Sequence, residues 1–197
     1  MTSKRSYSPC TGRKNAALAV CLALAIAVLA VAAPGLSVAE MPAEYQIKAA
    51  FVHNIAKFVQ WPEGALADPE EPFGLYILGE DRFGSAFDSF EDKIIHNRFL
   101  SVHRIEAWED IPDDCRILFV GVSERMGIQR VLRKVADRAI LTISDVPSFT
   151  ESEGIIGLLT VNNKLRFTVN RSSASKAGLI ISSNLLKLAL SIHGEIQ

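Results

Sequence analysis

The chain has 197 residues, of which 21 are basic and 22 acidic, and a formal net charge of −1 at pH 7. From Glu40 to Gln197 the balance is 17 basic against 22 acidic residues, a net charge of −5. This balance disfavours a general nucleic-acid binder, which would carry a basic excess. The length suits one compact domain with a substantial core.

The first 39 residues have the pattern of a secretory signal. Met1–Asn15 carries four basic residues and no acidic one, and the next eighteen residues are uncharged and apolar. Small residues follow at Ser37 and Ala39, the two positions that a signal peptidase recognises before the cleavage site. We therefore predict a signal peptide over 1–39, cleavage between Ala39 and Glu40, and a domain outside the cytoplasm over 40–197. An uncleaved membrane anchor is the alternative, because eighteen apolar residues reach the lower limit for a membrane span.

Residues 44–60 are predicted to form an amphipathic helix. Its apolar stripe would consist of Ile47, Phe51, Ile55 and Phe58, with Lys48 and Lys57 away from it. The helix should end before Trp61-Pro62, because a residue that precedes proline is pushed out of the helical region.

Strands and helices then alternate. Strands are predicted at 73–78, 100–105, 117–120 and 139–143, with a short helix at 83–90 and a helix from its cap Ser123 to about Val135. This order predicts an α/β domain of three layers, a mainly parallel sheet flanked by helices. Cys115, the only cysteine after residue 39, rules out an intramolecular disulfide there, and we expect it to be a buried small hydrophobe.

The C-terminal part changes character. Residues 155–161 and 165–169 read as two strands joined by Asn162-Asn163-Lys164, which predicts an antiparallel hairpin. Asn170 should cap a short helix that ends near Gly178, and Ser182 or Ser183 should cap a last helix through Leu190.

The usual catalytic signatures are absent from the sequence. It has no phosphate-binding or dinucleotide loop, no nucleophile elbow, and no histidine pair at metal-ligand spacing. We therefore predict a protein that is not an enzyme and that holds no cofactor and no metal. Asp81, Asp88 and Asp92 lie near a strand-to-helix connection, where loop and capping roles are expected.

Two blocks of sequence resemble the YfiR family. The first runs from Glu44-Tyr45-Gln46-Ile47-Lys48-Ala49-Ala50-Phe51 to Trp61-Pro62. The second includes Ser144-Asp145, Arg166-Phe167-x-Val169-Asn170, Ala177-Gly178-Leu179 and Ser182-Ser183-x-Leu185-Leu186. The resemblance spans residues 44–190.

This resemblance implies a periplasmic regulator. Proteins similar to YfiR restrain a membrane-bound diguanylate cyclase by binding its periplasmic sensor region, and an outer-membrane lipoprotein sequesters them in turn. This would connect the chain to cyclic di-GMP signalling and biofilm formation. The chain departs from well-known members, which carry paired cysteines, because it retains only Cys115 after residue 39.

The candidate partner-binding surface lies beside the predicted hairpin. Polar residues from the strand and the helix caps would flank an apolar rim, and a tryptophan would anchor the surface; these residues are Arg166, Thr168, Asn170, Ser182, Ser183, Leu179, Ile180 and Trp61. For Asn170 and Ser182 the alternative is a capping role only, and for Trp61 a buried role at a helix end.

Two other functions stay open at this point. The first is a small-molecule sensor or transport component with a crevice at the strand ends. The second is a hydrolase, for which the sequence offers no nucleophile–base pair. The apolar stripes could also support a homodimer.

Overall fold

A computed structural model describes residues 43–91, 93–108 and 111–194. The proposed signal segment and cleavage position therefore lie outside the described residues. Among the described helices, none is long and apolar enough to span a membrane.

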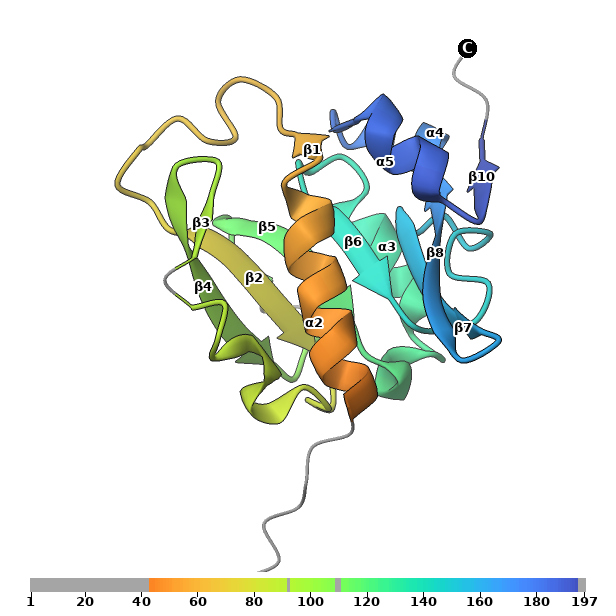
Figure 1. The fold of residues 1–197 in the computed structure, drawn as a ribbon. Coiled ribbons are helices and arrows are strands. Elements are labelled where there is room, and N and C mark those ends of the chain that lie inside the picture. Colours follow the sequence, from red (N-terminus) through yellow and green to blue (C-terminus); the bar gives the residue numbers. More distant parts are fainter. Residues whose placement is uncertain (1–42, 92, 109–110, 195–197) are drawn as a thin grey trace, which may run out of the picture. The chain divides into compact units, whose positions relative to one another are not determined.

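An eight-stranded sheet forms the centre of the fold (Figure 1). Its strand order is β10-β8-β7-β6-β5-β2-β4-β3. The strands are β2 (Phe73–Leu78), β3 (Ile94–Ile95), β4 (Arg98–Ile105), β5 (Cys115–Val120), β6 (Leu141–Ser144), β7 (Ile156–Val161), β8 (Lys164–Asn170) and β10 (Ser191–His193). The run β4-β2-β5-β6-β7 is parallel, whereas β8 is antiparallel to β7 and β3 to β4. The predicted mainly parallel α/β sheet and its C-terminal hairpin are confirmed.

Helices cover both faces of this sheet. One core cluster joins the sheet to α2 (Ala43–Ala56), the 3-10 turn η1 (Gly84–Phe87), α4 (Arg171–Lys176) and α5 (Ser183–Leu188). A second cluster joins the opposite face to α3 (Ile128–Val135). Strand β2 is apolar and buried throughout, and β5 is apolar and buried from residue 117 to residue 120, as expected for strands covered on both faces by helices.

The hairpin turn follows its sequence signal. Asn162 and Asn163 have φ values of 50° and 57°, so both adopt the left-handed conformation of a two-residue hairpin turn. At the end of α4, Gly178 has a φ of 70° and supplies the expected C-terminal turn.

The prediction for the first helix was wrong in two respects. The helix ends at Ala56, and Val59–Gln60 forms strand β1, which pairs with β9 (Ile180–Ile181) outside the main sheet. The proposed stripe is also split. Ile55 is buried, but Ile47 and Phe58 are 51% and 43% exposed. Lys48, predicted to lie away from the stripe, is buried. The helix carries apolar residues on two sides, so periodicity alone could not choose the buried one.

Three local predictions also need correction. Ser123 does not cap α3: its hydroxyl accepts a hydrogen bond from the Glu80 amide, and Gly127 occupies the N-cap position. The helix predicted at 83–90 is the short 3-10 turn η1, and α5 ends at Leu188 because the chain continues into β10.

Candidate functional site

A two-stranded ribbon connects the end of α2 to the C-terminal region. In β1 and β9, Val59 pairs with Ile181 and Gln60 with Ile180. The Ser182 amide extends the pairing by donating to the Phe58 carbonyl at 2.9 Å. This ribbon places the predicted residues Ile180 and Ser182 beside the chain segment that leads to Trp61.

Trp61 itself is an internal anchor. Its Nε1 donates to the Ala139 carbonyl at 3.0 Å, and its ring meets Phe73 edge to face at a centroid distance of 5.0 Å. Its neighbour Pro62 lies close to Gly178, where an added Cβ would be 3.4 Å from the proline Cγ. The indole is half-buried and holds the segment after α2 against the fold.

Leu179 and Ile180 line a hollow of about 130 Å³ beside the ribbon. Its other lining residues are Arg171, Ala174, Ser175 and Ile181. Leu179 is buried and forms a wall, whereas Ile180 is 63% exposed at the surface. An exposed isoleucine beside a small concave site that an arginine also lines is the kind of surface that receives an apolar anchor from a partner. We call this the ribbon surface.

Asn170 and Ser182 are helix caps. The Asn170 Oδ1 accepts from the Ser173 amide at 2.9 Å, and its Nδ2 donates to the Thr150 carbonyl at 2.8 Å. The Ser182 hydroxyl accepts from the Leu185 amide at 3.2 Å. These polar groups are therefore engaged within the fold. Ser183, the first residue of α5, is exposed.

Arg166 and Thr168 belong to the opposite side of the sheet from α5. Phe167 and Val169 point into the core that contains α2 and α5, so their neighbours along β8 face the other way. The Thr168 and Thr150 hydroxyls are 3.0 Å apart. Of the eight predicted residues, the structure thus groups Trp61, Leu179, Ile180 and Ser182 at the ribbon and separates Arg166 and Thr168 from them.

Sequence reasoning missed a buried ionic cluster. Lys48 Nζ, on α2, is 2.6 Å from Asp145 Oδ2, which follows β6, and the Tyr45 hydroxyl donates to the same oxygen at 3.0 Å. The side chains of Lys48 and Asp145 are only 6% and 7% exposed. Burial opposes the charge of Lys48, but hydrogen bonds to Asp145 and Glu44 raise its pKa above the ordinary value. The i, i+4 spacing of Glu44 and Lys48 was visible in the sequence, but their distant partner was not.

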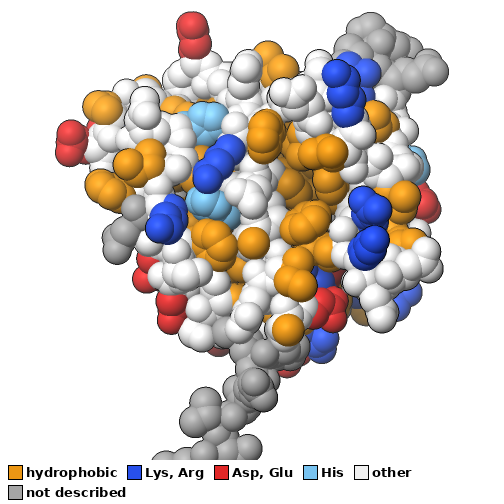
Figure 2. All heavy atoms as spheres, in the orientation of Figure 1, with side chains coloured by type: hydrophobic (Ala, Val, Ile, Leu, Met, Phe, Trp, Pro, Cys, Tyr) orange, Lys and Arg blue, Asp and Glu red, His pale blue; other side chains and the backbone are white. Residues whose placement is uncertain are grey.

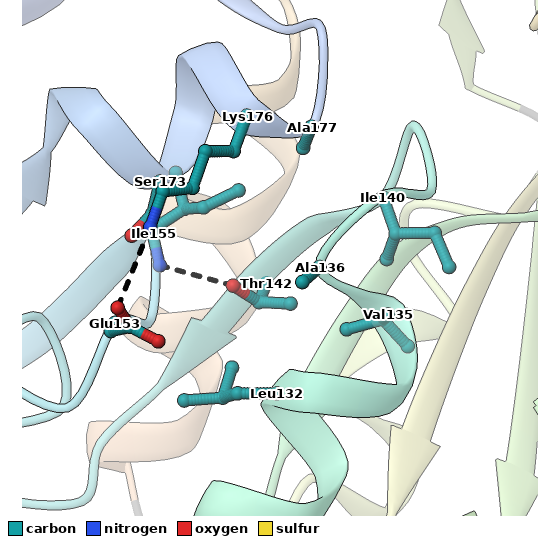
Figure 3. A pocket seen from close by; sticks show the side chains of 10 residues that line it. All are labelled: Leu132, Val135, Ala136, Ile140, Thr142, Glu153, Ile155, Ser173, Lys176 and Ala177. Carbon is teal, nitrogen blue, oxygen red and sulfur yellow. Dashed lines mark hydrogen bonds and ion pairs between the residues drawn. The ribbon is translucent and has the colours of Figure 1, made fainter.

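One further cavity is too small for an organic ligand. It lies between α3, β6 and α4 and has a volume of about 40 Å³ (Figure 3). An ion pair of 3.5 Å between Lys176 and Glu153 lies at this cavity, and the Thr142 hydroxyl accepts from the Ile155 amide at 3.0 Å. Because ligand pockets usually measure several hundred Å³, this space suits a few water molecules.

The described residues also contain no group of three or more histidine, cysteine or acidic side chains placed to hold a metal ion.

Comparison with known protein families identifies the family of this chain. A family model described as YfiR/HmsC-like matches residues 45–190. The chain belongs to the YfiR/HmsC-like family. This confirms the resemblance drawn from the two sequence blocks, and both blocks contribute to the Lys48–Asp145 cluster. No curated protein matches the chain.

Similarity to solved structures is confined to the fold. A conserved domain protein from Vibrio cholerae O1 biovar El Tor superposes with a TM-score of 0.50 at 9% identity. An ABC domain in complex with L-Trp from Streptococcus pneumonia gives a TM-score of 0.49 at 8% identity. Each match covers 75% of this chain and 60% of the other, so the YfiR/HmsC-like chain spans less than two thirds of either structure.

Proposed function

We propose that this protein is a periplasmic regulator that binds the outer portion of an inner-membrane signalling protein and thereby controls its cytoplasmic output. The partner class follows from the family, in which a diguanylate cyclase is the expected target. An outer-membrane lipoprotein that competes for the regulator is the expected second partner. The protein acts by sequestration and performs no catalysis.

The ribbon surface is the observation that supports binding most directly. Ile180 stands 63% exposed beside a hollow whose wall includes Arg171. Hot spots of protein interfaces are apolar anchors that become fully desolvated within a rim of polar groups. Arg171, which lines the hollow together with Ile180, supplies one polar group of such a rim, and Ser183 is exposed three residues further along the chain.

Binding can be measured directly. The chain from Glu40 to Gln197 is titrated with the periplasmic region of a membrane sensor encoded beside it. Ile180→Asp should weaken binding about tenfold or more, because it places a charge in a desolvated contact. Gln129→Asp on α3 is the matched control, since it adds the same charge on the opposite face. No detectable binding of the unmodified chain, or an equal loss in both variants, would reject the proposal.

Export is testable separately. Intact mass of the protein recovered from the periplasmic fraction should correspond to a chain that begins at Glu40. A mass that retains residues 1–39, found in the membrane fraction, would instead support the uncleaved anchor.

A second candidate function is supported by a larger hollow. It measures about 520 Å³ and is lined by residues 145–151, β7 and β10, with Thr168 in its wall. It lies beyond the carboxyl end of β6, the edge at which open α/β sheets bind small ligands. A thermal-shift screen would favour this function if one metabolite raised the melting temperature in proportion to its concentration, and Thr168→Val abolished the shift.

A further inference from the structure

Exposed apolar side chains and lysines occur together on the side of the sheet that α2 and α5 cover. On this side Phe58 is 43% exposed and Leu188 66% exposed. Each directly follows an exposed lysine, Lys57 and Lys187. A third exposed lysine, Lys93, lies near His53, whose pKa is lowered by burial and also by the charges of Lys57 and Lys93.

These three lysines carry charge that the described part of the chain does not neutralise. None of them forms an ion pair within 4.0 Å with a described residue. Figure 2 shows hydrophobic side chains gathered along α2 and between α2 and α5, with basic side chains beside them and acidic side chains at the margins and near the lower end of α2. This distribution contrasts with the net charge of −5 from Glu40 onward.

The apolar groups on this side stand on separate elements. Ile47 lies exposed on α2, Phe58 follows that helix, and Leu188 ends α5. They do not converge on one deep pocket; the nearest hollow, of about 260 Å³, is lined by Ile47, Leu165 and the carboxylate of Glu44. Dispersed apolar tips with adjacent lysines suit a bilayer surface, where the tips enter the headgroup region and the ammonium groups reach lipid phosphates.

We propose that this side, defined by Phe58, Leu188, Lys57, Lys93 and Lys187, docks on an anionic phospholipid bilayer. The inference rests on the proposed function only in placing the protein beside a membrane. Docking would hold the regulator on the surface from which the outer portion of its partner emerges. Phe58 projects from the same face of the ribbon as Ile180, because Ile180 pairs with Gln60, two residues after Phe58. The two contacts therefore adjoin, and the three lysines distinguish them, because none of them lines the hollow beside Ile180.

The test is co-sedimentation of the chain from Glu40 to Gln197 with vesicles. One set contains equal amounts of phosphatidylglycerol and phosphatidylcholine, and the other contains phosphatidylcholine alone. The protein should bind the anionic vesicles and release them as salt is raised from 50 to 300 mM, because salt screens the lysine–phosphate attraction. Binding to the neutral vesicles should be at least about tenfold weaker.

Two matched variants locate the contact. The triple variant K57Q/K93Q/K187Q should bind anionic vesicles at least about tenfold more weakly. The control R125Q/R133Q/K134Q removes three exposed cations on the α3 side and should stay within about twofold of the unmodified chain. Phe58→Ser combined with Leu188→Ser should also weaken binding, without changing the net charge.

Three outcomes would overturn the inference. In the first, the unmodified chain sediments with neither type of vesicle. In the second, the control variant loses as much vesicle binding as the triple variant. In the third, no vesicle is bound but the Phe58 and Leu188 variant loses affinity for the membrane sensor, which would make this side a protein contact. Partner binding without vesicle binding leaves the proposed function intact, whereas vesicle binding without partner binding rejects the proposed function alone.

Discussion

Lys48 and Asp145 form a buried ion pair of 2.6 Å between residues 97 positions apart in the sequence. The pair joins the start of α2 to the end of β6, and Tyr45 adds a hydrogen bond to the same carboxylate oxygen. The other oxygen, Asp145 Oδ1, is buried without a described partner. This carboxylate therefore depends on Lys48 and Tyr45 for compensation of its charge.

Lys48→Met should lower the free energy of unfolding by about 3–5 kcal/mol, because it leaves the Asp145 carboxylate buried without its counter-ion. The double variant K48M/D145L should be less destabilised than K48M, since it removes the orphaned charge as well. Urea denaturation followed by circular dichroism measures both.

An exposed ion pair provides the control for this experiment. Lys176 and Glu153 are 60% and 64% exposed and 3.5 Å apart. Lys176→Gln should therefore change the free energy of unfolding by no more than about 0.5 kcal/mol. If K48M proved no more destabilising than K176Q, the buried pair would not have the structural role that we assign to it.

His53 should make stability depend on pH. Its side chain is buried, its Nε2 has no described partner, and its ring lies 4.8 Å from that of Phe90. Burial lowers the pKa of His53, and the nearby Lys57 and Lys93 lower it further. The unfolded chain, with an ordinary histidine pKa of about 6.5, therefore binds the proton more readily than the folded one. The stability that the buried, neutral His53 contributes is fully present above about pH 6.5 and is lost as the pH falls through the pKa of His53 in the folded protein.

The measurement is a series of urea titrations between pH 8 and pH 5. Stability should decline below about pH 6.5, the ordinary histidine pKa. His53→Leu should flatten that decline, whereas His103→Gln, which removes an exposed imidazole stacked on Tyr76, should retain it. A decline of equal size in the His53 variant would assign the pH dependence to other groups.

Local signals account for the parts of the fold that the sequence predicted correctly. The hairpin turn needed two residues that tolerate positive φ, and Asn162 and Asn163 are such residues. The caps at Asn170 and Ser182 likewise depend on contacts within three residues. The buried runs 73–78 in β2 and 117–120 in β5 could be recognised because a strand segment covered on both faces is apolar.

The parts that the sequence could not predict depend on distant contacts. β1 and β9 are each two residues long, so neither has a periodicity to detect, and their pairing creates the ribbon surface. Packing against the sheet determines which side of α2 is buried, and Lys48 lies on that side because its ion-pair partner Asp145 is there. Ile180 could be named as a candidate from the sequence, but its exposure beside the hollow could not.

Asn170→Ala should destabilise the protein more than Ser182→Ala. The serine loses one cap bond, worth about 1 kcal/mol. The asparagine loses its cap bonds and also leaves the Thr150 carbonyl without the Nδ2 donor in a buried setting, for a total of about 2–3 kcal/mol. Asn170→Ser should fall between them, because serine can cap α4 but cannot reach Thr150. Thermal unfolding of the three variants tests the order, and equal losses for N170A and N170S would contradict the role given to the amide.

Cys115 should be unreactive in the folded protein. Its side chain is buried, its thiol donates to the Ile117 carbonyl at 3.4 Å, and burial raises the pKa of the thiol to about 12. Because the thiolate is the reacting species, both access and ionisation disfavour alkylation at neutral pH. Maleimide should therefore label the native chain from Glu40 onward far more slowly than the same chain in guanidinium chloride. Non-reducing gels should show no disulfide-linked dimer. Rapid labelling with the near-ultraviolet circular dichroism intact would mean that β5 opens at its first residue, and that the single thiol of this family member is available for redox control.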